Sequence, residues 1–177
     1  MIRLVEPSPA LHASWLASMQ EFGGAVLHGY STFRFEVEEL AVAAGFERWL
    51  ERERLQNERG IDGFVPATAW WIVDDAAPGT VLGSIHLRHE LNEWLLAEGG
   101  HIGYGVRPSA RGRGVATAAL LLVLERARAM GIERVLLCCE SDNPASRATI
   151  VAAGGVLEDV RESAEHGRYE RYWIALG

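Results

Sequence analysis

The chain has 177 residues, 49% of them hydrophobic, and a formal net charge of −7. This length favours a single domain over residues 1–177, and the composition suffices for a sizeable buried core. The acidity argues against a nucleic-acid binder, which would carry a basic face. The longest apolar run, Val115 to Leu124, is too short to span a membrane. No signal peptide is evident, and the adjacent cysteines Cys138 and Cys139 cannot easily pair, so we expect a cytoplasmic location.

The first half of the chain predicts one strand, two helical regions and a strand hairpin. The stretch "IRLVEPS" has strand character, and residues 9–22 and 36–59 carry apolar side chains at helical spacing. We interpret the charged end of the second region, "ERWLERERLQNERG", as a solvated face closed by Gly60. The strands "TAWWIVDD" and "TVLGSIHLRHEL" are expected to pair antiparallel around a turn in "DAAPG".

The second half alternates between strands and helices. A glycine-rich strand, "GGHIGYGV", precedes a helix over residues 112–130, and "ERVLLCCE" reads as a strand buried on both faces. A short helix in "DNPASRATIVAAGG" has an Asx start and a glycine stop, and a last hairpin surrounds "AEHG". The unit over residues 101–139 predicts a right-handed parallel crossover, and the other strands should be antiparallel. The predicted fold class is α+β, or mixed α/β.

A positive island lies where the longest apolar helix begins. Arg107, Arg111 and Arg113 occur in a stretch, Gly99 to Leu124, that has no acidic residue. A helix start exposes unpaired N–H groups and the positive end of the helix dipole, and Gly112 and Gly114 allow close approach. These features predict a cradle for phosphate oxygens. The alternative is a glycine turn with solvated arginines.

Two known phosphate motifs fit poorly. A P-loop requires a lysine that is absent here. For a dinucleotide fingerprint, Gly112 and Gly114 are followed by Thr117 at the third glycine position, although Glu140 lies about where a ribose-binding acid would. A dinucleotide fold usually begins with this unit, whereas here it comes late in the chain. A dinucleotide ligand is therefore the weaker alternative.

The segment "RGRGVA", Arg111 to Ala116, resembles the R/Q-x-x-G-x-G/A signature of the GNAT acetyltransferase superfamily. "HIGYGVRPSARGRG" is similar to the fourth strand and pyrophosphate loop of that family, and "LLCCESDNPASRATIVAAGG" to its fifth strand and following helix. The order of elements fits from residue 2 to 176. The resemblance implies a mostly antiparallel sheet of six to seven strands with helices on both faces. It implies transfer of the acetyl group of acetyl-CoA to an amine of a small molecule or peptide.

The resemblance also implies where acetyl-CoA binds. It would lie between the fourth and fifth strands, which splay apart, with Gly103 and Gly105 allowing its thioester to come close. Its pantetheine arm would pair with the backbone of Val106, and Asn143, which also reads as a helix cap, would bond near the sulfur. The full set of implied binding residues is Val106, Arg111, Gly112, Arg113, Gly114, Val115, Ala116, Thr117, Asn143, Ser146 and Arg147.

Direct attack by the amine in a ternary complex needs a base, and a backbone N–H near Val106 would serve the oxyanion. The candidates are His101, His89, Glu90 and Tyr104, with the histidines ranked first because imidazole titrates near neutral pH. Each also has a structural interpretation. In many relatives a tyrosine seven residues after the asparagine protonates the leaving thiolate, but that position is Ile150 here.

Other readings stay open. A GNAT-like domain could sense acyl-CoA without turnover, and a nucleotide-dependent oxidoreductase is a more distant alternative. Strand aromatics, Trp70, Trp71, Trp94, Tyr169, Tyr172 and Trp173, belong either to the core or to an amine-binding wall. The six histidines show no metal-type spacing with the cysteines, so no metal is expected. Dimers are common in this family, so a homodimer is one expectation.

Overall fold

The computed structural model describes residues 1–164 and 167–177. These residues form β1 (Ile2–Val5), α1 (His12–Gln20), α2 (Val37–Leu40), α3 (Ala43–Arg59), β2 (Ala67–Asp74), β3 (Ala77–Arg88), β4 (Ile102–Val106), α4 (Val115–Ala129), β5 (Arg134–Glu140), α5 (Pro144–Ala152), β6 (Val156–Ser163) and β7 (Gly167–Ala175). The short turns η1 (Pro9–Leu11), η2 (Leu95–Gly99) and η3 (Pro108–Ala110) connect them. This order confirms the predicted fold class, α+β with mostly antiparallel strands. No helix among the described residues is long and apolar enough to cross a membrane.

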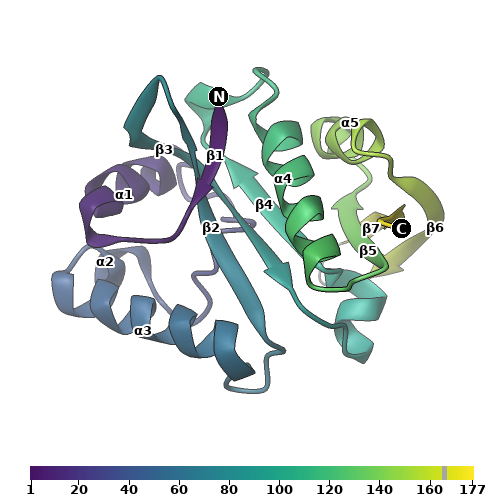
Figure 1. Cartoon of the computed structure of the whole chain (residues 1–177), viewed down its shortest axis with the longest axis horizontal. Coiled ribbons are helices and arrows are strands. Elements are labelled where there is room, and N and C mark those ends of the chain that lie inside the picture. The colour runs from purple at the N-terminus through teal and green to yellow at the C-terminus, as the bar shows by residue number, and fades with distance from the viewer. Residues whose placement is uncertain (165–166) are drawn as a thin grey trace.

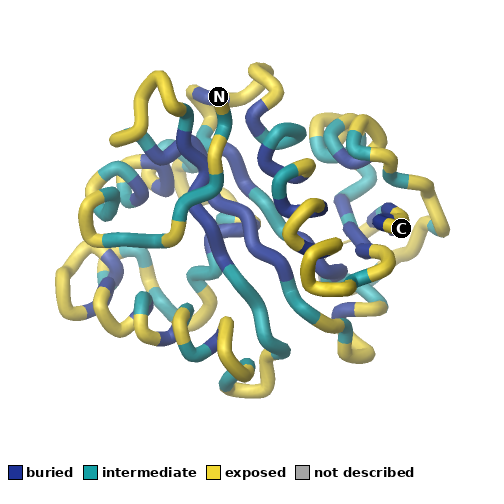
Figure 2. Tube along the Cα trace, in the orientation of Figure 1, coloured by how far each residue is buried: buried dark blue, intermediate teal, exposed yellow. Residues whose placement is uncertain are grey.

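The strands form two antiparallel sheets rather than one continuous sheet (Figure 1). One has the order β1-β2-β3-β4, and the other has β5-β7-β6. A core of Trp15, Phe46, Trp49 and Trp71 packs α1 and α3 on one face of the first sheet. The main core joins the opposite face to α4, α5 and the second sheet. Helices therefore cover both faces, as expected, and the buried strands run through the centre of the molecule (Figure 2).

The two sheets meet where β4 and β5 begin. The backbone N–H of His101 donates to the carbonyl of Leu136 at 2.7 Å, and the N–H of Leu136 donates to Nδ1 of His101 at 2.9 Å. Beyond this point, no backbone hydrogen bond joins β4 to β5 in the described part of the chain. The expected crossover strands thus touch at one end and are otherwise separate, as a splayed ligand cleft requires.

The loop between α1 and α2 rests directly on β4. A Cβ at Gly29 would lie 2.3 Å from Cα of Tyr104, and a Cβ at Gly105 would lie 2.3 Å from the carbonyl oxygen of His28. Neither position has room for a side chain. The backbone of this loop is therefore in contact with the backbone of β4, on the face that carries α1 and α3.

Three details differ from the sequence expectation. Residues 77–79, expected in the turn of "DAAPG", belong to β3, because Ala77 pairs with Asp74 across irregular ladder positions. The second helical region is divided into α2 and α3 at residues 41–42. The last hairpin is confirmed as β6 and β7, but residues 165–166 of its expected turn lie outside the described residues.

The charged end of α3 is not a solvated face throughout. Arg52 and Gln56 are only 8% and 4% exposed, and the Glu53 side chain is 9% exposed. They continue the helical spacing of Phe46 and Trp49 and so remain on the face toward the sheet. The solvated face includes Glu51, Arg54 and Glu58, whose ion pairs are exposed. The earlier interpretation was wrong because it counted charges without following their helical period.

Candidate active site

The loop before α4 has the backbone geometry of an anion cradle. Gly112 and Gly114 have φ of +70° and +73°, a region that favours glycine, and Gly114 caps α4. No atom lies within 4 Å of a Cβ built at either position, so the loop is open to a ligand. The first N–H groups of α4 have no partner inside the helix, and its first turn has no acidic residue. We call residues 111–117 the phosphate cradle.

The positive island is partly neutralised from a distant part of the chain. Glu21, at the end of α1, accepts hydrogen bonds from Nε and Nη2 of Arg107 and from the N–H and hydroxyl of Ser109. The hydrogen bonds from Arg107, followed by those from Ser109, lower the pKa of Glu21 to about 2. Arg107 is therefore a structural clamp for this loop. The sequence did not show this partner of the positive island, because Glu21 is remote from Arg107 in sequence.

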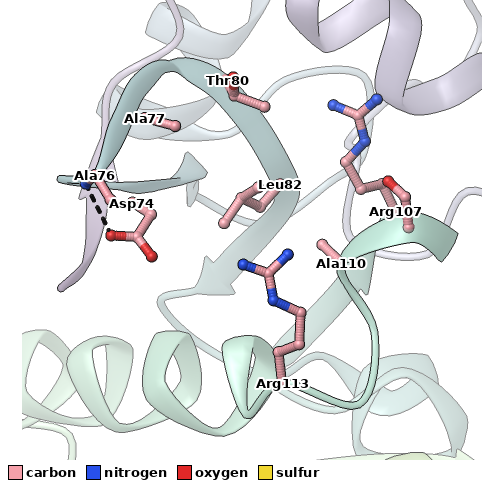
Figure 3. A pocket seen from close by; sticks show the side chains of 9 residues that line it. Asp74, Ala76, Ala77, Thr80, Leu82, Arg107, Ala110 and Arg113 are labelled. Carbon is pink, nitrogen blue, oxygen red and sulfur yellow. Dashed lines mark hydrogen bonds between the residues drawn. The ribbon is translucent and has the colours of Figure 1, made fainter.

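The other two arginines differ in availability. Arg111 donates from Nε to the carbonyl of Val106 at 3.0 Å, and its guanidinium lies 5.3 Å from the ring centre of Phe22. Arg113 is exposed and makes no hydrogen bond or ion pair within residues 1–164 and 167–177. Figure 3 shows its side chain pointing into a cavity of about 340 Å³ bordered by Asp74 and Leu82. Arg113 is the arginine best able to meet a ligand phosphate.

On the edge of β4 beside the cradle, the N–H of Val106 has no partner among the described residues, whereas its carbonyl accepts from Arg111. Arg88 N donates to His101 O, and Arg107 N donates to Leu82 O, both at 2.8 Å. These bonds show that the backbone groups of His101 and Arg107 face β3. Backbone groups alternate in direction along a strand, so the N–H and C=O groups of the even-numbered residues Tyr104 and Val106 point away from β3. The N–H of Val106 therefore faces the space between β4 and β5.

Helix α5 forms the other wall of this space. The side chain of Asn143 accepts from Ser146 N at 3.0 Å, which confirms its role as a helix cap. The hydroxyl of Ser146 lies 2.9 Å from that of Tyr104, across the gap between α5 and β4. Burial raises the pKa of Tyr104 to about 12, so its hydroxyl is a weak acid. Asn143, Ser146 and Tyr104 thus converge where the thioester end of the arm is expected.

Arg147 forms an ion pair with Glu170. Its Nε and Nη2 donate to the two carboxylate oxygens of Glu170 at 2.8 and 2.7 Å, and Nη2 also donates to the carbonyl of Ser141. The hydrogen bonds from Arg147 lower the pKa of Glu170 to about 2. This bidentate pair ties α5 to β7 and leaves Arg147 poorly placed for the phosphate role that the resemblance implied.

His101 holds the sheets together rather than facing the cleft with a free nitrogen. Its Nδ1 accepts from Leu136 N, so the proton of the neutral ring is on Nε2 and no lone pair is free. Burial, with a contribution from nearby Arg88, lowers the pKa of His101 to about 4. This arrangement favours a structural role at the base of the cleft.

His89 and Glu90 follow the end of β3. The Nε2 of His89 lies 2.8 Å from the hydroxyl of Thr68, which itself donates to Asn57. Glu90 is exposed. Among the described residues, no three His, Cys, Asp or Glu side chains gather as metal ligands would, and His166 lies outside those residues.

Ile150 is fully buried in the main core, against Gly155. A larger polar ring at this position would strain the core beneath α5. A leaving-group acid cannot simply be restored here.

A second cavity, of about 270 Å³, lies on the other face of the first sheet. Ser31, Arg52, Glu53, His86 and Arg88 line it together with apolar side chains. Sequence reasoning missed these polar residues. The available signal was the helical spacing of Arg52 and Gln56 after Trp49, and the alternation that places His86 and Arg88 on one face of β3. Of the strand aromatics, Trp94 lines this cavity, whereas Trp70, Trp71, Tyr169 and Tyr172 are buried.

Solved structures of acetyltransferases resemble this chain, whereas no curated sequence matches it. The microcin C7 self-immunity acetyltransferase MccE, solved with acetyl-CoA and AMP, is 17% identical with a TM-score of 0.70, over 98% of this chain and 92% of that one. The ribosomal-protein-S5-alanine acetyltransferase of Vibrio fischeri is 14% identical with a TM-score of 0.72, over 98% and 91% of the chains.

RimL, a ribosomal L7/L12 α-N-protein acetyltransferase solved with coenzyme A, is 20% identical with a TM-score of 0.67, over 98% and 93% of the chains. At identities this low, the TM-scores show that the structures share a fold and no more. The sequence model of the acetyltransferase (GNAT) domain matches residues 10–156, which is most of the chain. The chain belongs to the GNAT family of acetyltransferases.

Proposed function

We propose that the protein transfers the acetyl group of acetyl-CoA to the nitrogen of an amine, by direct attack within a ternary complex. The observation that carries this proposal is the phosphate cradle, with its left-handed Gly112 and Gly114, placed directly after a strand whose open edge faces a splayed cleft. Both features suit the two ends of one ligand, a pyrophosphate and an extended pantetheine arm.

Each part of the site has a role in this proposal. The N–H groups of Arg111 to Thr117 bind the pyrophosphate, and Arg113 adds a positive charge. A backbone N–H on the open edge of β4, that of Tyr104 or Val106, donates to the carbonyl oxygen of the thioester as negative charge develops there. Asn143 and Ser146 orient the arm near its sulfur. Acetyl-CoA supplies the activated acetyl group, so no metal or redox chemistry is required of the protein.

The reaction balances with one base. The acceptor ammonium gives a proton to the base, and its nitrogen lone pair forms a bond to the thioester carbon. The carbon–sulfur bond breaks, the new amide nitrogen loses its second proton to water, and the thiolate takes a proton from water. A coenzyme A thiol leaves readily near neutral pH because its pKa is about 8.5, so a dedicated acid at position 150 is not needed.

The geometry favours a base that was not among the sequence candidates. His101 has no free lone pair, and Tyr104 is a weak acid with its hydroxyl on Ser146. His89 and Glu90 stay weaker candidates at the end of β3. Glu53 lines the second cavity beside His86, and His86 lies directly under Gly103 of β4. We therefore assign the proton-accepting role to Glu53.

Two measurements test the proposal. Acetyl-CoA should raise the melting temperature, because it binds only the folded state, and NADH should not. Release of free thiol from acetyl-CoA should then depend on an added amine. A shift with NADH alone would favour an oxidoreductase. A shift with acetyl-CoA but no thiol release, with any amine of a panel of amino acids, polyamines and peptides, would identify a sensor instead of an enzyme.

A further inference from the structure

The second cavity lies where an acceptor would meet the thioester. It is bounded by α3, by β2 and β3, and by residues 91–95, on the face of the sheet opposite α4. Its wall residue His86 is opposite Gly103 in the β3–β4 ladder, and a Cβ at Gly103 would lie 2.8 Å from the His86 ring. The cradle follows the C-terminal end of β4, whereas this cavity adjoins its N-terminal end. An arm that runs along β4 from the cradle therefore points its thioester toward this cavity, named here the acceptor pocket.

The acceptor pocket has apolar walls and is small. Phe33, Phe64 and Trp94 line it on three separate segments, and Leu95 and Val65 add aliphatic surface. A volume of about 270 Å³ is below the roughly 300–1,000 Å³ that is typical of pockets for drug-sized ligands. The pocket thus suits a ligand of about the size of one amino acid, with an apolar side chain.

One wall carries a guanidinium with no counter-ion. Arg88 is half-buried, and its Nη1 donates to the carbonyls of Gly99 and Gly100 at 3.0 and 2.9 Å. Within residues 1–164 and 167–177, no carboxylate forms an ion pair with it, and its Nε and Nη2 make no hydrogen bond. Burial lowers its pKa to about 10, which leaves it charged at neutral pH. A half-buried guanidinium with two unused donors is a ready partner for a planar anion.

The opposite wall supplies acceptors for an amine. Glu53 accepts from Ser31 Oγ at 2.9 Å and from Arg52 Nη1 at 3.0 Å, both at Oε1, so Oε2 remains available. Burial raises the pKa of Glu53 to about 7. One turn further along α3, the Oε1 of Gln56 is buried with no hydrogen-bond partner among the described residues. An unpaired buried acceptor costs free energy unless a donor meets it.

His86 does not change this charge pattern. Burial, with a smaller contribution from Arg88, holds its pKa well below the usual range, and the carbonyl of Gly29 faces its ring. It is therefore neutral across the physiological pH range. Among the described residues, the acceptor pocket accordingly presents the unpaired cation of Arg88, the carboxylate of Glu53 paired with Arg52, and the unpaired amide oxygen of Gln56.

We propose that the acceptor pocket binds an amine that carries its own carboxylate, namely a free amino acid with an apolar side chain. The carboxylate lies on Nε and Nη2 of Arg88, the amine faces Glu53 and Gln56, and the side chain lies against Phe33, Phe64 and Trp94. The inference rests on the proposed acetyl transfer and names its acceptor class. A peptide N-terminus has an amide beside its amine, which would leave Arg88 without a counter-ion.

The test compares matched acceptors that differ only in the carboxylate. Thiol release from acetyl-CoA is measured with L-leucine, L-methionine and L-phenylalanine and with the amide of each, and the acetylated product is identified by mass. We expect kcat/KM at least about tenfold higher for at least one free acid than for its amide, because charge-assisted hydrogen bonds to Arg88 are lost in the amide.

Arg88→Gln and Arg88→Lys test the residue itself. Arg88→Gln should raise KM for the free acid by about tenfold or more, with little change for the amide. Arg88→Lys, which keeps the charge without the planar fork, should be intermediate. Because Arg88 also bonds Gly99 and Gly100, the acetyl-CoA affinity and the melting temperature of each variant are measured, and the amide acts as an internal control for damage to β4.

Three results would overturn the assignment. The first is a kcat/KM for the amides equal to that for their free acids. The second is an equal rise in KM for the free acid and for its amide in Arg88→Gln. The third is bound acetyl-CoA with no free acid acetylated, whatever happens with peptides or polyamines. Failure of the proposed acetyl transfer itself would give a different result. Acetyl-CoA would then cause no thermal shift, or no amine would cause thiol release.

Discussion

The phosphate cradle and the acceptor pocket are built in opposite ways. The cradle is one continuous segment, residues 111–117, and it offers mainly backbone N–H groups. The acceptor pocket gathers side chains from α3, from two strands and from loops. Its lining residues are spread along the chain from Ser31 to Leu95. Backbone recognition depends on local conformation, which a few glycines determine. Side-chain recognition depends on the whole fold, and it can therefore differ between relatives that keep the same cradle.

The largest expected effect is at the acceptor pocket. Glu53→Gln should lower kcat by about 100-fold at pH 8, since a positioned base contributes roughly 10²- to 10⁴-fold. In the parent, kcat should rise with pH through about 7, because only the ionised carboxylate accepts a proton. The groups facing Glu53 are Arg52 and Ser31 and, from β3, His86 and Arg88. Burial holds the pKa of His86 well below this range and lowers the pKa of Arg88 only to about 10.

The control is Glu51→Gln, on the exposed side of the same helix and paired with Arg54. It should leave both the rate and the pH profile unchanged. If kcat of Glu53→Gln still rises with pH at the same midpoint, the base is another group and the acceptor pocket serves only to bind the amine.

The next effect is at the cradle. Gly114→Val should weaken acetyl-CoA binding by about 30-fold, because a branched residue at φ of +73° is strained and would occupy the phosphate path. Gly131→Val is the matched control, since Gly131 has φ of +79° with open space around it, at the other end of α4. Calorimetric titration measures both. Equal affinities for the two variants would place the phosphates elsewhere.

A smaller effect should separate backbone from side-chain recognition within the cradle. Arg113→Ala should weaken acetyl-CoA binding by about fivefold, because one charge-assisted contact is lost while the N–H groups remain. The loss should shrink in high salt, since Arg113 is exposed. Arg59→Ala makes the same change of net charge at the exposed end of α3 and should have no effect. A loss of hundreds-fold for Arg113→Ala would mean that side chains dominate here too.

A comparably small effect is expected between the two sites. Tyr104→Phe should lower turnover by less than about tenfold and leave acetyl-CoA affinity unchanged, because the Tyr104 hydroxyl is a weak acid already bonded to Ser146. Single-turnover kinetics with saturating acetyl-CoA give the comparison. A thousandfold loss would show that Tyr104 protonates the leaving thiolate.

The same comparison explains what could be predicted from the sequence. The order of elements, the cap at Asn143 and the open cradle follow from local periodicity and turn chemistry, and all are found in the structure. The partner of Arg107 could not be found this way, because Glu21 lies 86 residues away and meets it only after α1 packs on the sheet. Glu53, which we propose as the base, was missed for a related reason, since it lies within a run of charges of which Glu51, Arg54 and Glu58 are exposed. Long-range packing decides which charges of such a run are buried.

The close approach of Gly29 to Tyr104, and of Gly105 to His28, has a consequence for attempts to redesign this enzyme. Two backbones touch there with no space for a side chain, so the path of the loop over β4 cannot be altered by substitution at either glycine. Selection for new acceptors should leave both positions fixed. Diversity should instead be introduced at Phe33, Phe64 and Trp94, whose side chains are 47%, 38% and 49% exposed and tolerate changes of size. A library built this way varies the choice of amine while the site of the acetyl donor stays intact.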